Sequence, residues 1–158
     1  MHEYLINARE DMKRINHSVY VSLKYTRTVD VIKNILKRMI TTLNHVVTDL
    51  LEFSIQKKKI EEYPLSIPLR CELVKELYRG EEFSEELRSL VNFLLLLRRI
   101  DKIEDYTKIN EYRRHVALIT EIDGKRIEVN LDEIQEYYHK TQRFIELTHE
   151  IIFGKKDD

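Results

Sequence analysis

The sequence predicts a mainly α protein, an antiparallel five-helix bundle with one β-hairpin (about 115–130) before the last helix. With 3 Gly and 2 Pro among 158 residues, the chain has few of the turn formers that an all-β fold needs. Apolar residues recur at alternating spacings of three and four along most of the chain, which places them on one face of a helix. Near His115 the spacing changes to strict alternation on both sides of Asp123-Gly124, a strong hairpin signal. The length suits one core, so residues 1–158 are predicted to form a single helical domain with a frayed tail at about 155–158.

The first helix is predicted over about 3–24, and the second follows an apolar stripe over 29–51. The first helix has one stripe, formed by Leu5, Ala8, Met12, Ile15 and Val19. The second is apolar on two sides and must be buried on both. The segment 24–28 between them contains neither Gly nor Pro, so one continuous helix is the alternative. Two helices are favoured because the first stripe, if continued, meets polar residues, and because Thr26 or Thr28 can cap the second helix.

The middle of the chain predicts a loop and two further helices. Two prolines in the segment 63–68 indicate the loop. A short third helix, about 69–79, is expected to end at Gly80. Ser84, followed by two glutamates, is the predicted N-cap of a fourth helix over about 84–105.

In the predicted hairpin, Ile122 opposite Lys125 sets the register. The same register places Glu121 opposite Arg126 as an attractive pair. It gathers six apolar residues on one face: Val116, Leu118, Ile122, Ile127, Val129 and Leu131. Because a two-stranded ribbon is marginal alone, this face must lie on the helices or on another chain.

The second strand of the hairpin leads directly into the last helix. Val129 is predicted to be buried, whereas Glu128 and Asn130 face water. Asn130 also has the spacing to Glu133 of a reciprocal helix cap. The last helix is therefore predicted over about 131–153.

The overall charge excludes a general attraction to nucleic acid or membrane. The formal net charge is -1, from 27 Lys and Arg and 28 Asp and Glu. A single cysteine excludes an internal disulfide, and the first residues lack the apolar core of a signal peptide. The most apolar run, Leu90 to Leu97, is far shorter than a membrane span. The protein is therefore expected to be cytoplasmic, without a membrane partner.

The charges are unevenly distributed along the chain. Residues 9–38 hold eight Lys and Arg against three Asp and Glu, whereas residues 60–90 hold eight Glu against four Lys and Arg. Helical spacing places on one face of the first helix Arg9, Lys13, His17, Tyr20 and Lys24. A basic face with an aromatic ring suits single-stranded RNA, because it can meet phosphates and stack a base. The alternative is an ordinary solvated face, or one that meets the acidic region of another subunit.

No metal site is predicted, although several histidines lie near carboxylates. Glu136-x-x-His139 and Glu146-x-x-His149 have the spacing that di-iron sites use, but such sites need facing helices. Both motifs lie on the last helix, ~15 Å apart along its axis. Two other pairs lack a third ligand nearby in sequence: His45 with Asp49, and Glu111 with His115.

No catalytic residue and no cofactor are predicted either. Cys71 and the serines lack a recognisable base in their local sequence. The three glycines form no phosphate-binding loop. Cys71 is instead predicted to be a small buried apolar residue.

The order of two long helices, a short one and two more long ones resembles the HEPN family of helical bundles. The segment 98–106, from Arg98 to Tyr106, is similar to the Arg-to-Asp-Tyr stretch of its non-catalytic members. Ribonucleolytic members carry Arg, four to six residues and His, which Arg143-x5-His149 matches, but about 1.5 such matches arise by chance. Six residues also rotate a helix by ~600°, which places these two side chains ~120° apart. The resemblance implies a non-catalytic bundle, with a HEPN-type ribonuclease as the alternative.

The sequence thus predicts a non-enzymatic helical interaction module, either RNA-associated or one partner of a two-component system. A metal-binding helical-bundle enzyme is a further alternative. A homodimer is expected, because the second and fourth helices are apolar around more of their circumference than a small monomer can cover. Residues 112–146 are also similar to small uncharacterised archaeal proteins, and the 35% charged content is compatible with a thermophilic source.

Overall fold

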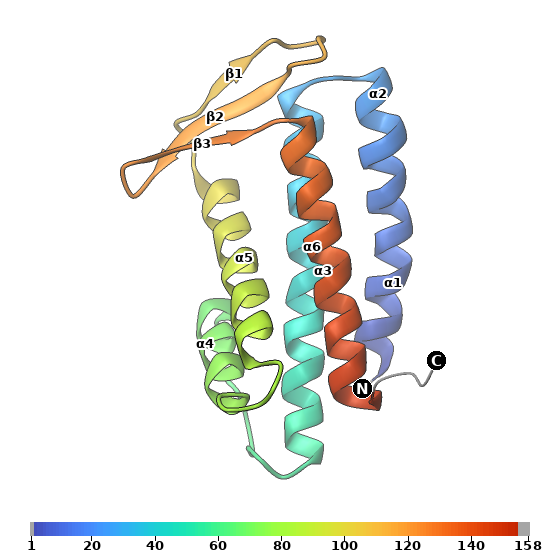
Figure 1. Cartoon of the computed structure of the whole chain (residues 1–158), viewed down its shortest axis with the longest axis vertical. Helices are drawn as coiled ribbons and strands as arrows, with labels where there is room; N and C mark the ends of the chain where they lie inside the picture. The colour runs from blue at the N-terminus through green and yellow to red at the C-terminus, as the bar shows by residue number, and fades with distance from the viewer. Residues whose placement is uncertain (1, 155–158) are drawn as a thin grey trace.

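The structure, a computed structural model, describes residues 2–154, and their side chains from residue 7 onward. Four long helices stand side by side: α1 (His2–His17), α3 (Val29–Gln56), α5 (Ser84–Lys102) and α6 (Leu131–Phe153). The short helix α4 (Ile67–Leu77) lies beside the lower part of α5, and a small sheet covers the upper end (Figure 1). The predicted mainly helical bundle is therefore confirmed. The predicted frayed tail, about 155–158, lies outside the described residues.

The first helix is continued by two short segments, η1 (Ser18–Ser22) and α2 (Leu23–Tyr25). η1 is a π turn, in which the N–H of Leu23 donates to Ser18 five residues before it. The helix then stops, and Thr28 caps α3 by accepting a hydrogen bond from the N–H of Val31 at 3.2 Å. The prediction of two helices rather than one is confirmed, and Thr28 is the cap.

α3 occupies the centre of the bundle and contacts α1, α4, α5 and α6. Its two apolar sides are both buried within the chain, as shown by Ile35, Val47 and Leu51, each at most 1% exposed. Burial on two sides explains why its apolar stripe is wide. Among the described helices, none combines the length and the apolarity needed to cross a membrane.

Three predicted boundaries in the middle of the chain are wrong. α4 begins at Ile67 rather than 69, because Pro68 is tolerated in a first turn, where its missing N–H needs no partner. Ser84 is the first residue of α5 rather than its cap, a position that Phe83 takes without a side-chain hydrogen bond. α5 ends at Lys102 instead of about 105, because the chain turns extended at Ile103.

The sheet has three strands rather than two: β1 (Thr107–Ile109), β2 (Ala117–Ile122) and β3 (Lys125–Val129), in the antiparallel order β1-β2-β3. The predicted register of β2 and β3 is confirmed, with Ile122 opposite Lys125 and Glu121 opposite Arg126. β1 pairs with β2 over three residues, too few to give an alternating pattern in the sequence.

The inner face of the sheet lies on the chain's own helices. β2 contacts α3 and α5, and β3 contacts α6. Val116, Leu118 and Val129 are at most 1% exposed, so the predicted burial of Val129 is confirmed. Glu128 and Asn130 are half-buried, because Asn130 donates to Glu128 at 3.0 Å and accepts from the N–H of Glu133 at 2.9 Å. Asn130 is therefore the predicted cap of α6.

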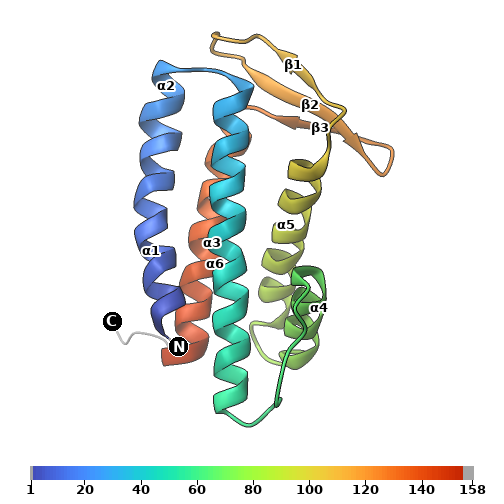
Figure 2. The same ribbon diagram turned by 180° about the vertical axis from the view of Figure 1, so that it is seen from behind.

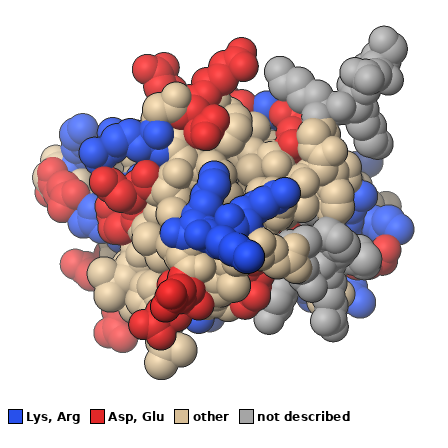
Figure 3. All heavy atoms as spheres, turned by 90° about the horizontal axis from the view of Figure 1, so that it is seen from below, with Lys and Arg blue, Asp and Glu red and all other residues tan. Residues whose placement is uncertain are grey.

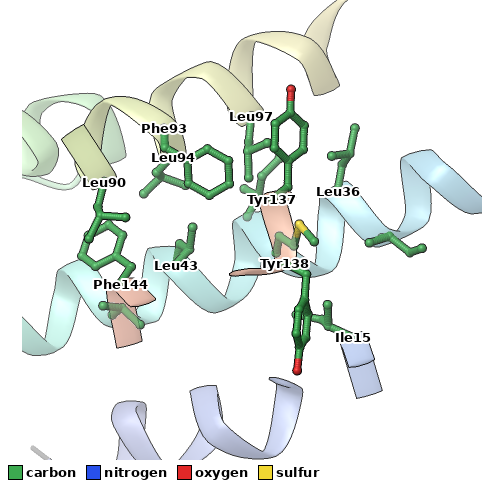
Figure 4. Packing of buried hydrophobic residues seen from close by; sticks show 14 of the residues in the cluster. Ile15, Leu36, Leu43, Leu90, Phe93, Leu94, Leu97, Tyr137, Tyr138 and Phe144 are labelled. Carbon is green, nitrogen blue, oxygen red and sulfur yellow. The ribbon is translucent and has the colours of Figure 1, made fainter. Parts of the chain in front are cut away.

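α6 holds the bundle together by presenting consecutive tyrosines to opposite sides (Figure 4). Tyr137 points toward α5, where its ring centroid lies 5.4 Å from that of Phe93. Tyr138 points toward α1, and its hydroxyl accepts a hydrogen bond from Asn16 at 2.9 Å. Phe144, six residues after Tyr138, is fully buried against α3 and α5.

Candidate nucleic-acid interface

The five residues predicted to bind RNA all lie on the exposed side of the rod formed by α1, η1 and α2. They are exposed along its whole length: Arg9, Lys13, His17, Tyr20 and Lys24. The apolar stripe that fixes this orientation is buried, with Ala8 and Ile15 at 0% exposure. The helical periodicity thus predicted correctly which side chains of this rod face solvent.

This rod and α3 lie side by side (Figure 2). Two shallow hollows are lined by residues of both. One hollow of about 440 Å³ is lined by Lys13, Arg14, His17, Ser18, Ser22 and Arg38. A neighbouring hollow of about 240 Å³ is lined by Asp11, Lys37, Arg38 and Thr41. Arg38 lines both hollows, and the two together are named here the α1–α3 groove.

The α1–α3 groove contains more cations than carboxylates. Lys13 lies 3.4 Å from Glu10, and Arg14 lies 3.7 Å from Asp11. Such exposed ion pairs are weak, so both cations can exchange their partners for a ligand at little cost in free energy. Within the part of the chain that the structure describes, neither Lys37 nor Arg38 has a carboxylate within ion-pair distance. The groove therefore has a positive charge that its own carboxylates do not neutralise.

The structure brings only two of the five predicted residues, Lys13 and His17, into this groove. Tyr20 lies on the opposite flank, where its ring packs edge-on against Tyr138 of α6 with centroids 5.7 Å apart. Arg9 and Lys24 line neither hollow. The predicted face is thus broader than the groove and turns from α3 toward α6.

Sequence reasoning missed the contribution of α3 to this groove. Lys37, Arg38 and Thr41 follow helical spacing and are exposed. Their spacing marks a solvent-facing side of α3, but no pattern within one helix shows which neighbour lies beside it. The excess of basic residues over 9–38 was the available signal, because it spans both helices.

The histidine–carboxylate pairs do not converge. Among residues 2–154, no three His, Cys, Asp or Glu side chains are placed to hold a metal ion. Glu111 instead accepts a hydrogen bond from the N–H of Val29 at 3.1 Å, which caps α3. Asp49 is fully buried in α3, and burial raises the pKa of its carboxyl to about 6.

The guanidinium of Arg143 is engaged in ion pairs within the bundle. It forms a bidentate ion pair with Glu86 of α5, at 2.7 Å for both nitrogens, and a further pair with Glu150 at 3.1 Å. The hydrogen bond from Arg143 lowers the pKa of Glu86. His149, the other half of the Arg-x5-His pattern, packs its ring against Phe153 with centroids 4.7 Å apart.

A second basic cluster lies at the lower end of the bundle, where α3 ends. Figure 3 shows Lys and Arg gathered at the centre of this end, with acidic side chains toward its rim. The turn after α3 consists of Lys57, Lys58 and Lys59. The ammonium groups of Lys57 and Lys59 lie over the rings of Phe53 and Tyr78, at 5.5 and 5.0 Å from the centroids. Cations also stabilise the C-terminal end of a helix, so this cluster has a structural role.

Comparisons with protein-family models, curated proteins and solved structures find no match to this chain.

Proposed function

We propose that this protein is a non-enzymatic helical module that binds single-stranded RNA along the outer face of α1, η1 and α2 and in the α1–α3 groove. The observation that carries the proposal is the row of cations from two helices on one concave surface. Lys13, Arg14 and Arg38 line one hollow, and Lys37 joins Arg38 in the next.

Such a groove suits a phosphate backbone for electrostatic reasons. Each phosphate neutralised by a Lys or Arg releases a condensed counterion, which favours binding and makes it dependent on salt. A groove of cations that follows a backbone is how proteins bind single strands without reading their sequence. The hydroxyls of Ser18, Ser22 and Thr41 add neutral donors for phosphate oxygens along the same surface.

The contacts of Arg143 argue against the HEPN-type ribonuclease alternative. A catalytic arginine must reach a phosphate, but this guanidinium is already bound to Glu86 and Glu150. The HEPN resemblance is therefore proposed only in its non-catalytic form. A protein partner, as in a two-component system, is the competing occupant of the groove and is an outcome of the test below.

The test measures fluorescence anisotropy of a labelled oligouridylate of about 12 nucleotides at ~50 mM salt, where phosphate contacts are strong. Changing Arg9, Lys13 and Lys24 together to Glu is expected to abolish binding. The matched control changes Lys57, Lys58 and Lys59 to Glu, with the same change in charge in the turn after α3, outside this face. Circular dichroism verifies that both triple variants are folded.

The expected result is wild-type binding that weakens as salt rises and survives in the control triple variant. No retention of RNA by the wild type near ~50 mM salt would overturn the proposal in favour of a protein partner. Equal loss in both triple variants would overturn it as well, because it would show attraction to overall charge rather than to this face.

A further inference from the structure

Two tyrosines are almost fully exposed at the upper end of the molecule. Tyr25, the last residue of α2, is 80% exposed, and Tyr112, in the connection between β1 and β2, is 78% exposed. Among the tyrosines whose side chains the structure describes, these two are the most exposed. The two segments that carry them lie next to each other above α3 (Figures 1 and 2).

Tyr112 is held in a conformation that costs energy. Its φ of +66° lies in the left-handed region, which a bulky side chain rarely adopts. The N–H of Tyr112 donates to the carbonyl of Arg27 at 2.6 Å, which fixes this loop to the turn after α2. Strain of this kind persists only where the surroundings enforce it, and it is concentrated at functional positions.

Hydrogen bonds hold the loop in place on both sides of Tyr112. The preceding Glu111 binds the N–H of Val29 at the start of α3. Asn110, also left-handed with a φ of +52°, donates from its side chain to the carbonyl of His115 at 3.2 Å. The N–H of Arg113 closes a turn onto Asn110 at 3.0 Å. The ring of Tyr112 is therefore presented to solvent by an ordered backbone.

The neighbours of Tyr112 carry unneutralised positive charge. Arg113, Arg114 and His115 follow it directly and are exposed. Within residues 2–154, no carboxylate lies within ion-pair distance of Arg113 or Arg114. The carboxylate of Glu111 is turned inward to cap α3. An exposed ring next to cationic side chains is the combination with which proteins stack the bases of a single strand and contact its phosphates.

This surface lies at the upper end of the rod that lines the α1–α3 groove. Arg14, Ser18 and Ser22 line the groove at spacings of four, and Tyr25 follows Ser22 after three. Tyr25 thus lies on the same rod, above the residues that line the groove, and Arg27, whose carbonyl accepts the hydrogen bond from Tyr112, lies two residues beyond it.

We propose that Tyr25 and Tyr112 form a stacking platform on which bases of single-stranded RNA lie, while Arg113 and Arg114 contact its phosphates. This inference rests on the proposed function, and it adds base contacts to what the groove achieves through phosphates alone. It also assigns the aromatic contact to Tyr25 and Tyr112 rather than to Tyr20, whose ring is engaged with Tyr138.

The test compares binding of oligouridylate with binding of an abasic strand of the same length and charge. The wild type is expected to prefer the strand with bases by about tenfold or more, because each stacked base contributes that much. Tyr25→Ala and Tyr112→Asn are each expected to reduce this preference while leaving the affinity for the abasic strand unchanged. Asn tolerates the left-handed backbone of position 112, so the loop is retained. The matched controls Tyr25→Phe and Tyr112→Phe keep a ring and are expected to keep the preference.

The outcomes separate this inference from the proposed function. Equal binding of both strands by the wild type would overturn the platform and leave phosphate binding in the groove intact. Loss of affinity for both strands in the Ala and Asn variants would also overturn it, by showing that the tyrosines shape the groove instead of stacking. No binding of either strand by the wild type would overturn the proposed function and the platform together.

Discussion

The two flanks of the bundle contain the same residue types but use them differently. On the α5–α6 flank, Arg143 joins two helices by binding Glu86 and Glu150. On the α1–α3 flank, Lys37 and Arg38 have no carboxylate within ion-pair distance among the residues that the structure describes. On the α5–α6 flank, the cation of Arg143 forms ion pairs that join two helices. On the α1–α3 flank, the cations of Lys37 and Arg38 remain available to bind a ligand. Partner geometry, rather than composition, separates a structural cation from a binding one.

The largest expected effect on stability comes from placing a charge where it has neither an ion-pair partner nor contact with solvent. Val129 is fully buried on the inner face of the sheet, so Val129→Asp places a carboxylate without a partner among apolar side chains. We expect it to lower the free energy of unfolding by roughly 3 kcal/mol or more. Urea titration measures this effect, with Glu128→Asp on the other face as the control. Unchanged stability would show that the sheet does not pack as described.

Asp49 is the natural example of a buried carboxyl, and its oxygens accept no hydrogen bond from the described residues. Burial raises the pKa of Asp49 from 3.8 to about 6. The folded state therefore keeps a proton that the unfolded state releases between these values, so stability falls as pH rises through this window and levels off above it.

Asp49→Asn should remove this pH dependence. We expect it to increase the free energy of unfolding near neutral pH by about 3 kcal/mol, since burial raises the pKa from 3.8 to about 6 and one pKa unit corresponds to about 1.4 kcal/mol. The exposed Asp105→Asn serves as the control. Urea titrations from pH 4 to pH 8 measure the effect, and a variant whose stability still falls over this range would contradict it.

The third effect tests the paired flank itself. Arg143→Gln breaks ion pairs that are partly exposed, so we expect a loss of only about 1 kcal/mol in the free energy of unfolding. Because Arg143 lowers the pKa of Glu86, this contribution is present above the ordinary pKa of Glu86 and is lost as pH falls through its lowered value.

The control for Arg143→Gln is Arg79→Gln, which breaks a more exposed pair within one segment, with Glu76. Thermal unfolding at neutral and acidic pH measures both. An effect of Arg143→Gln that persisted undiminished in acid would show that its cause is lost packing and not the ion pair with Glu86.

The sequence predicted whatever depends on local periodicity and pairing. The buried stripe of α1, the cap at Thr28 and the register around Asp123-Gly124 each follow from a few neighbouring residues. β1 was missed because its three residues form a strand only by pairing with β2. Ser84 was wrongly predicted as a cap because the turn before α5 places Phe83 there instead.

The difference between local patterns and contacts between distant elements also explains what could be predicted of the candidate site. Spacing along one helix identified Lys13 and His17 as exposed, but it also included Tyr20, whose contact with Tyr138 depends on where α6 lies. Tyr112 left no signal in the sequence, since its loop is held by a hydrogen bond from the N–H of Tyr112 to Arg27, far away along the chain. Sites formed between elements are therefore the part that local patterns do not reveal.

The smallest expected effect on stability is the sharpest test of the two flanks. Lys37→Gln with Arg38→Gln removes two exposed cations without carboxylate partners among the described residues, so we expect the free energy of unfolding to stay within about 0.5 kcal/mol. The same double variant should bind single-stranded RNA more weakly and with less dependence on salt. The slope of log K against log salt is negative, and each lost phosphate contact reduces its magnitude by about 0.7. Losing two contacts therefore reduces the magnitude by about 1.4. Anisotropy titrations at several salt concentrations measure this slope. Lower stability with an unchanged slope would mean that the α1–α3 flank, like the α5–α6 flank, uses its cations for structure.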